Sequence, residues 1–293
     1  MYADDSTIHL SGKTINEIQA KAQEDLLQVE EWCANNSMFI NCEKMKCLII
    51  GTRQKISSQN DQIHLTINGN VLQFSVSEKL LGVKIDAHLS WTEQIDQVCS
   101  KISSRIYLLS KIKKFLNMES RKLFYSGYIL PLIDYCCVIW GNCSNEGLNR
   151  ILKLQKRAAR LILDMDPLSP SEPLFKQLGW MRVDDRIKYH KYLLVYKSLR
   201  KEAPSYLTDK FNYISQDNPY SLRNVVNGNL QTPKPKTELF KKSFAYSGSV
   251  LWNNLPTSIR NIPTLGSFKE NMKKYISNHA LQGDNTTMYD TCL

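Results

Sequence analysis

Residues 95–116 read IDQVCSKISSRIYLLSKIKKFL, and this stretch divides the chain into a mixed first part and a helical remainder. Apolar residues recur in it every three or four positions, which is the spacing that places side chains on one face of an α-helix. The stretch therefore predicts one long amphipathic helix, whose inward positions are Ile95, Val98, Cys99, Ile102, Ile106, Leu109, Ile112 and Leu116.

The first ninety residues combine one helical pattern with several strand patterns. Thr14 and Glu17 have the spacing of a capping box at the start of an amphipathic helix over 15–34. Asn68-Gly69 is the strongest short signal for a two-residue hairpin turn. This combination predicts an α+β layer, with strands at 38–40, 47–50, 63–67, 71–74 and 81–86.

Helical patterns dominate the rest of the chain. The segment 147–163 (GLNRILKLQKRAARLIL) places apolar residues on one side and bases on the other. Three prolines within 164–173 mark a boundary, beyond which helices are expected at 183–201, 239–253 and 264–279. We therefore expect an α+β part over 1–90, a basic helical part over 91–164, a mainly helical part over 165–282 and a frayed tail over 283–293.

Composition and charge narrow the class of protein. The hydrophobic content of 42% supports a buried core, and the net charge of +10 favours polyanionic partners. Residues 97–164 carry twelve bases against four acids, whereas residues 1–50 carry eight acids against four bases. The eight cysteines form no CxxC pair and have no histidines at zinc-ligand spacing, so we expect reduced thiols. No secretory or membrane-spanning pattern occurs, so we expect a nuclear or cytoplasmic protein.

The adjacent carboxylates Asp4 and Asp5 are the most suggestive acid pair, but as a bare pair they favour a solvated acidic terminus. Phosphoryl transfer with two metal ions requires carboxylates that converge on one point. Successive side chains of a strand point to opposite faces, so at least one further acid must come from elsewhere.

The surrounding sequence gives the pair a context. Tyr2-Ala3-Asp4-Asp5 is followed by MFINCEKMKCLII (38–50) and then by LGVKIDAHLSW (81–91). In order and spacing, these blocks resemble the second half of the palm of the reverse transcriptases of LINE-type retrotransposons, which lack long terminal repeats, especially the jockey-like clade. The resemblance reaches about residue 280, because SFAYSGSVLWNNLPTSIR (243–260) is similar to the carboxy-terminal extension of that family.

The resemblance implies a catalytic role for the first block. Asp4 would be the metal-binding carboxylate and Asp5 its weaker neighbour, with Mg²⁺ as the cofactor. Tyr2 would lie beside the primer terminus. Lys44, in Asn41-x-x-Lys44, would assist the leaving pyrophosphate as an acid or as a charge near the phosphates. A solvated lysine after a turn is the alternative for Lys44.

The resemblance also implies contacts with nucleic acid, namely an RNA template and a DNA primer, or an RNA/DNA hybrid, with no membrane partner. Leu81, Gly82 and Val83 would help to position the primer, although Gly82 could equally be an ordinary strand glycine. The basic helices would form the thumb and track a phosphate backbone, unless they are merely a solvated polar face. The backbone candidates are Lys101, Arg105, Lys111, Lys113, Lys114, Lys153, Lys156, Arg157 and Arg160.

Aromatic residues in the later helices could stack on bases. At helical spacing, however, such residues belong more often to a core, and we expect this for Trp180, Tyr189, Tyr192 and Tyr196.

The departure from the family lies upstream of Tyr2, where the fingers and the palm block with the other metal-binding aspartate do not occur in this sequence. We therefore expect a carboxy-terminal fragment of an RNA-directed DNA polymerase, inactive on its own. Two alternatives stay open. One is a non-catalytic module that binds RNA or DNA, and the other is a non-functional product of a truncated retroelement.

Overall fold

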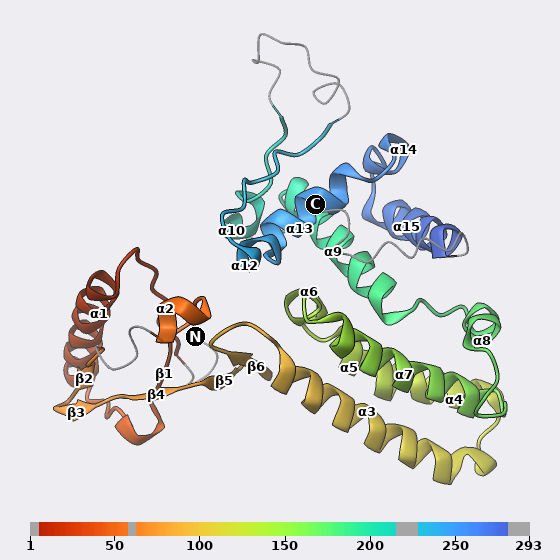
Figure 1. Cartoon of the computed structure of the whole chain (residues 1–293), viewed down its shortest axis with the longest axis horizontal. Helices are drawn as coiled ribbons and strands as arrows, with labels where there is room; N and C mark the ends of the chain where they lie inside the picture. Colours follow the sequence, from red (N-terminus) through yellow and green to blue (C-terminus); the bar gives the residue numbers. More distant parts are fainter. Residues whose placement is uncertain (1–5, 58–62, 215–227, 281–293) are drawn as a thin grey trace. The chain divides into compact units, whose positions relative to one another are not determined.

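The computed structural model describes residues 6–57, 63–214 and 228–280, and the chain has two compact units, Met1–Glu93 and Gln94–Leu293 (Figure 1). The first unit combines helices with short strands, and the described part of the second is built of helices apart from one isolated β-bridge. This composition is the mixed α+β class expected from the sequence. No helix within the described ranges is long and apolar enough to cross a membrane.

Helix α1 (Ile15–Asn35) provides one wall of the first unit's core. It begins where predicted, because the Glu17 backbone N–H donates to Thr14 Oγ1 at 3.3 Å, the hydrogen bond of an N-cap. Gln23 on α1 exchanges two hydrogen bonds with the backbone of Thr66, at 2.9 and 3.0 Å. This contact fixes the helix against the strands over a core of Ala22, Leu26, Ile63, Leu65, Ile67 and Leu72.

The strands of the first unit form three separate pairs. β1 runs parallel to β4, whereas β2 with β3 and β5 with β6 are antiparallel hairpins. A 3₁₀ turn over Cys42–Lys44 precedes β1, and the short helix α2 (Arg53–Ser57) follows it. The strands are β1 (Lys46–Leu48), β2 (Thr66–Ile67), β3 (Asn70–Val71), β4 (Gln73–Ser75), β5 (Ser77–Leu80) and β6 (Val83–Asp86).

Both hairpins turn through two residues with positive φ. The predicted turn at Asn68-Gly69 is confirmed, with φ of 49° and 74°. A second turn of this kind lies at Leu81-Gly82, with φ of 46° and 84°. Such turns match the twist of antiparallel strands. The expected strand over 81–86 is therefore shorter than predicted, because its first two residues form the turn and β6 begins at Val83.

The strand expected at 38–40 is wrong. Ser37 adopts a positive φ of 55° just after α1, and residues 38–40 have no strand partner. Phe39 is fully exposed, whereas Ile40 is partly buried against the first unit's core. An apolar run predicts a strand only if a neighbouring strand pairs with it.

The second unit begins with helix α3, which confirms the long helix predicted from 95–116. Six of the eight predicted inward residues are buried, and Ile112 and Leu116 are half-buried. The helix ends at Ile112, and a 3₁₀ turn over Lys113–Phe115 follows. The next helical stretch contains one π-helical turn over Tyr125–Ile129, and it is followed by α5 (Leu130–Asp134), whose second residue is Pro131. Proline lacks a backbone N–H, so the regular hydrogen-bond ladder is interrupted there.

Helix α9 is the centre of the carboxy-terminal part, because α13 and α15 both pack against it (Figure 1). The core includes Val195, Tyr196, Trp252, Phe268 and Met272. The helices of the second unit are α3 (Thr92–Ile112), α4 (Met118–Phe124), α5 (Leu130–Asp134), α6 (Cys137–Trp140), α7 (Asn145–Ile162), α8 (Ser171–Leu178), α9 (Val183–Leu199), α10 (Ser205–Thr208), α12 (Glu238–Lys241), α13 (Phe244–Asn253), α14 (Thr257–Arg260) and α15 (Leu265–Ala280).

Candidate nucleic-acid interface

Helices α3 and α7 touch near both of their ends and run in the same direction. Near their beginnings, Arg150 Nη2 lies 2.7 Å from Asp96 Oδ1. Near their ends, Lys113 Nζ lies 2.7 Å from Asp164 Oδ1. The first contact joins the two helices themselves, and the second joins residues just beyond their ends. The Asp96 side of α3 therefore borders the Arg150 side of α7.

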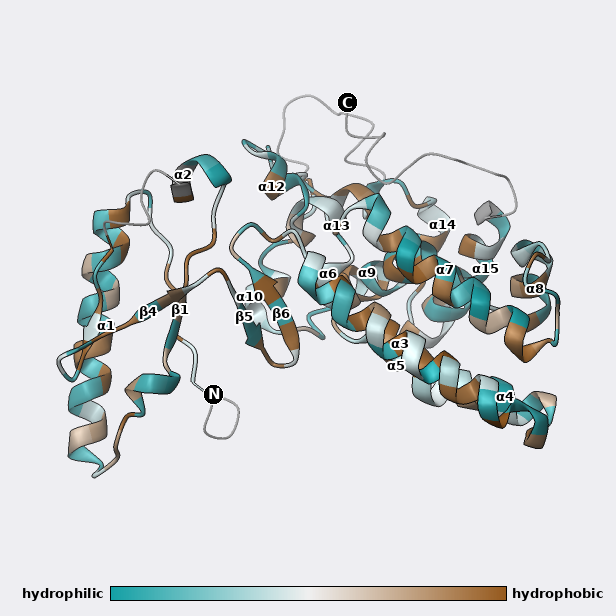
Figure 2. Cartoon of the chain, turned by 60° about the horizontal axis from the view of Figure 1, so that its bottom comes forward, coloured by the Kyte–Doolittle hydropathy of each residue, from teal (hydrophilic) through white to brown (hydrophobic). Residues whose placement is uncertain are grey.

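Helix α7 is amphipathic, and Figure 2 shows hydrophilic and hydrophobic residues alternating along it. Ser144 caps its first turn by accepting a hydrogen bond from the Gly147 backbone N–H at 3.2 Å. Arg150, Lys153 and Arg157 follow at positions i, i+3 and i+7, which lie on one side of a helix. The buried residues of α7 are Gly147, Leu148, Ile151, Leu152, Gln155, Ala158, Ala159 and Ile162.

The side of α3 that borders this basic row carries an exposed aromatic ring. Asp96, Ser100, Tyr107 and Lys111 fall on one stripe of the helix, and Asp96 contacts α7. The Tyr107 side chain is 60% exposed, and Lys111 Nζ lies 5.1 Å from its ring centroid. We define the α3–α7 strip as Tyr107, Lys111, Arg150, Lys153 and Arg157.

A second basic and aromatic group lies on another side of α3. The Arg105 guanidinium carbon lies 5.1 Å from the ring centroid of Tyr128, and this ring stacks on Phe124 at 5.2 Å. Lys101 is exposed one turn before Arg105. The predicted backbone residues on α3 therefore divide between two sides of the helix, and only one of these sides borders α7.

The remaining backbone candidates differ in how far their charges are engaged within the protein. Lys113 is paired with Asp164, and Arg160 Nε donates to the Ser169 carbonyl at 2.8 Å. Lys114 lies over the Phe115 ring at 5.0 Å, and Lys156 is half-buried. These residues are therefore weaker candidates than Lys153 and Arg157, which are exposed.

The electrostatics of this region favour an anionic ligand. Residues 97–164 contain four acids, and three of them form ion pairs with bases. These pairs are Asp134 with Arg186, Asp164 with Lys113 and Arg121, and Glu119 with Lys122. In contrast, no carboxylate within the described ranges forms an ion pair with Lys153 or Arg157. Exposed like charges held close together repel one another, and an approaching polyanion relieves this repulsion.

The candidates of the first unit are only partly described. Lys44 is exposed in the 3₁₀ turn, where its backbone N–H donates to Asn41 Oδ1 at 3.3 Å. Leu81 and Gly82 form the exposed turn of the second hairpin, and Val83 is buried.

The remaining candidates, Tyr2, Asp4 and Asp5, lie outside the described residues, so their role as a metal site stays a prediction. Among the residues that the structure describes, no group of three or more His, Cys, Asp or Glu side chains could hold a metal ion.

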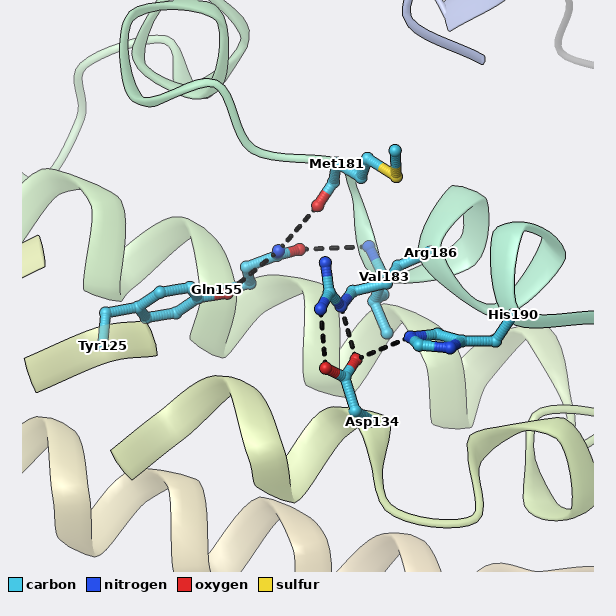
Figure 3. Close-up of polar contacts among 7 residues, drawn as sticks. All are labelled: Tyr125, Asp134, Gln155, Met181, Val183, Arg186 and His190. Atoms are coloured by element: carbon cyan, nitrogen blue, oxygen red, sulfur yellow. Dashed lines mark hydrogen bonds and ion pairs between the residues drawn. The ribbon is translucent and has the colours of Figure 1, made fainter. Parts of the chain in front are cut away.

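A buried polar network that the sequence analysis missed joins α7 to the start of α9 (Figure 3). Gln155 Nε2 donates to the Met181 carbonyl at 2.9 Å and to the Tyr125 hydroxyl at 3.2 Å. Its Oε1 accepts from the Val183 backbone N–H at 3.1 Å. The available signal was a polar residue at an inward position of 147–163, because such a residue requires buried hydrogen-bond partners.

An ionic contact beside this network joins α5 to α9 (Figure 3). Arg186 binds Asp134 through two hydrogen bonds, one of them from Nη2 to Oδ2 at 2.6 Å, and His190 Nε2 lies 3.2 Å from Asp134 Oδ1. Burial alone would raise the pKa of Asp134, but the hydrogen bonds from Arg186 and His190 outweigh it and lower that pKa.

The aromatic residues of the later helices are mainly structural, as expected. Tyr189, Tyr192 and Tyr196 are buried in the core around α9. Trp180 is half-buried and stacks on Tyr125, with ring centroids 3.6 Å apart. The seven cysteines in the described part of the chain carry free thiols, and burial raises the pKa of Cys137 to about 12. Cys292 lies outside that part.

Comparison with known proteins places this geometry in a family context. The "Probable RNA-directed DNA polymerase from transposon BS" of Drosophila melanogaster is 25% identical over 195 residues, which are 64% of this chain and 21% of that protein. The "RNA-directed DNA polymerase from mobile element jockey" of Drosophila funebris is 26% identical over 201 residues, 66% of this chain and 21% of that protein.

A third relative comes from another insect. The "Retrovirus-related Pol polyprotein from type-1 retrotransposable element R1 2" of Nasonia vitripennis is 22% identical over 143 residues, 47% of this chain and 35% of that protein. No family profile and no solved structure matches the chain.

These matches relate the chain to the RNA-directed DNA polymerases of transposable elements. More narrowly, they confirm the resemblance to the jockey-like, LINE-type reverse transcriptases that the motifs indicated. The chain spans about a fifth of the length of the first relatives that it matches.

Proposed function

We propose that this chain is a portion of a retrotransposon RNA-directed DNA polymerase, and that its helical unit holds the nucleic acid through the α3–α7 strip. The observation that carries this proposal is the basic row on α7, in which Lys153 and Arg157 are exposed and Arg150 is paired with Asp96, beside Tyr107 and Lys111 on α3. Lysine and arginine side chains in such a row match the regular charge of a phosphate backbone.

The aromatic rings support a ligand that has flat apolar surfaces as well as charge. Tyr107 and Tyr128 are each more than half exposed and each lie beside a cation. Exposed aromatic rings within a basic surface are typical of proteins that bind single-stranded nucleic acid, because bases stack on them. A merely solvated helical face does not require these rings.

For the whole polymerase, we propose template-directed addition of deoxynucleotides to a primer. The 3′ oxygen of the primer forms a bond to the α-phosphorus of the nucleotide, and pyrophosphate leaves. By resemblance, Asp4 and Asp5 would hold Mg²⁺, whose charge would stabilise the transferring phosphoryl group. Lys44 supplies positive charge or a proton to the leaving pyrophosphate. Leu81, Gly82 and Val83 position the primer.

The binding proposal predicts the effect of removing two charges from the strip. We expect Lys153→Gln/Arg157→Gln to weaken binding of a fluorescent RNA/DNA hybrid about tenfold, because two phosphate contacts are lost. Fluorescence anisotropy at about 100 mM salt measures this change.

Lys269→Gln/Lys273→Gln is the matched control, since these exposed lysines have the same spacing on α15. We expect the control to bind within about twofold of the original protein. Equal weakening by both double variants would show that only net charge matters and would contradict the proposed strip.

The activity proposal is tested by primer extension with a purified polypeptide of these 293 residues. We expect no template-dependent incorporation above that of Asp4→Ala, because by resemblance the metal site also uses a carboxylate from the palm block that precedes the Tyr2-Ala3-Asp4-Asp5 block in the family. Incorporation that Asp4→Ala abolishes would contradict this expectation.

The same polypeptide distinguishes the two alternatives. If it binds nucleic acid without incorporating deoxynucleotides, the non-catalytic binding module is the better description. An insoluble or degraded product would favour the non-functional reading.

A further inference from the structure

A pocket of about 450 Å³ lies in the carboxy-terminal part of the helical unit, separate from the α3–α7 strip. Its walls come from the end of α9, the loop after α10, and helices α13 and α14. The volume falls within the range of sites that bind small organic molecules. The residues that matter here are Tyr196, Arg200, Tyr213, Trp252, Arg260 and Asn261.

Two guanidinium groups give the pocket a positive charge. Arg200 lies over the Tyr196 ring at 5.2 Å and donates to the Ile262 carbonyl at 3.1 Å. Arg260 donates to the Gly228 carbonyl at 3.3 Å. These hydrogen bonds hold the guanidinium groups in place but leave both charges uncompensated, because neither forms an ion pair with a carboxylate of the described residues.

The hydroxyl of Tyr213 lies within the field of both charges. Arg200, Arg260 and Tyr213 line the same pocket. Burial raises the pKa of Tyr213, and the positive charges of Arg200 and Arg260 act on that pKa in the opposite direction. Burial lowers the pKa of Arg260, since a charged group loses hydration there. Arg260 is half-buried and Arg200 is exposed, and a partly buried cation without a carboxylate partner favours an anionic ligand.

Two buried N–H groups of the pocket residues also lack acceptors. The Trp252 side chain is only 2% exposed, and its indole Nε1–H has no hydrogen-bond partner among the described residues; the same is true of Arg260 Nε. Buried donors are nearly always satisfied in folded proteins, so an unsatisfied pair beside a pocket indicates a missing acceptor. An anion with several oxygen atoms would supply one.

We propose that this pocket binds the phosphate group of a nucleotide. A phosphate monoester carries close to two negative charges and several acceptor oxygens, which match two guanidinium groups, a phenol and the Asn261 amide. The pocket is larger than a phosphate ion, so room remains for the attached sugar, and the half-exposed Tyr213 ring offers a face for the base. The phosphate comes either from the 5′ end of a strand or from a free nucleoside monophosphate.

The test compares two fluorescent ten-nucleotide RNAs that differ only in a 5′-phosphate or a 5′-hydroxyl. We expect the protein to bind the phosphorylated RNA about tenfold more tightly than the hydroxylated RNA, or to bind AMP in competition with inorganic phosphate. Preference between the RNAs identifies a strand end as the source. Binding of AMP without such a preference identifies a free nucleotide.

Arg200→Gln and Tyr213→Phe should each reduce the measured preference or AMP affinity by at least fivefold. Tyr213→Phe removes only a hydroxyl, and its unchanged thermal melting would show that the loss is not due to unfolding. Lys176→Gln on α8 removes one exposed charge outside the pocket and should leave the preference intact. The proposal would be overturned if the protein neither preferred the phosphorylated RNA nor bound AMP. It would also be overturned if Lys176→Gln reduced the RNA preference or the AMP affinity as much as Arg200→Gln does.

The pocket does not depend on the function proposed for the strip. Lys153→Gln/Arg157→Gln should weaken both RNAs equally and leave their ratio unchanged. If Lys153→Gln/Arg157→Gln bound the 5′-phosphorylated and 5′-hydroxyl RNAs with equal affinity, a separate phosphate pocket would be contradicted.

Discussion

Replacing Gln155 with leucine is expected to lower the free energy of unfolding of the helical unit by about 3 to 5 kcal/mol, since each buried polar group left unpaired costs about 1 to 3 kcal/mol. Gln155 is 1% exposed, and leucine would fill much of its volume while leaving the Val183 N–H, the Met181 carbonyl and the Tyr125 hydroxyl without its hydrogen bonds. Urea denaturation followed by circular dichroism measures the change.

The matched control for this substitution is Gln177→Leu on α8. Gln177 is exposed, so its replacement should change the unfolding free energy by less than about 0.5 kcal/mol. If Gln155→Leu were as stable as this control, the buried network would not contribute to the packing of α7 against α9.

Replacing Asp134 with asparagine is expected to lower the free energy of unfolding by about 2 to 3 kcal/mol at about pH 7. The substitution keeps the volume but leaves the partly buried Arg186 guanidinium without its carboxylate. Breaking a buried ion pair costs about 3 to 5 kcal/mol, and we reduce this range because about a quarter of each side chain is exposed to solvent.

This second prediction carries a pH dependence with a definite sign. Because the pKa of Asp134 is lowered in the folded protein, its contribution is fully present above the unfolded pKa of about 3.9 and is lost as the pH falls through the folded value. The difference in unfolding free energy between the original protein and the Asp134→Asn variant should therefore narrow below about pH 4. A difference that is constant with pH would contradict the assigned ion pair.

The control for this substitution is Glu119→Gln, which breaks an exposed ion pair with Lys122 and should lower the unfolding free energy by less than about 1 kcal/mol.

Features set by neighbouring residues could be predicted from the sequence. The N-cap at Thr14 and the turn at Asn68-Gly69 depend on side chains and φ angles within a few residues, and both are present. The inward faces of α3 and α7 follow from helical spacing alone. The basic face of α7 could therefore be predicted from the sequence of the helix alone.

Features that join distant parts of the chain could not be predicted in this way. Arg186 and Asp134 are 52 residues apart, and no local pattern pairs them. The pocket likewise combines Arg200, Tyr213 and Arg260 from separate elements. The error at 38–40 has the same origin, because whether an apolar run becomes a strand depends on a partner elsewhere in the chain.

The central claim, that the α3–α7 strip contacts a phosphate backbone, is tested most directly by the salt dependence of binding. Each neutralised phosphate contributes about 0.7 to 0.9 to the slope of log affinity against log salt concentration. We predict that Lys153→Gln/Arg157→Gln has a slope shallower by about 1.4 to 1.8 than the original protein on an RNA/DNA hybrid, whereas Lys269→Gln/Lys273→Gln keeps the original slope. An identical slope for all three proteins would contradict the account.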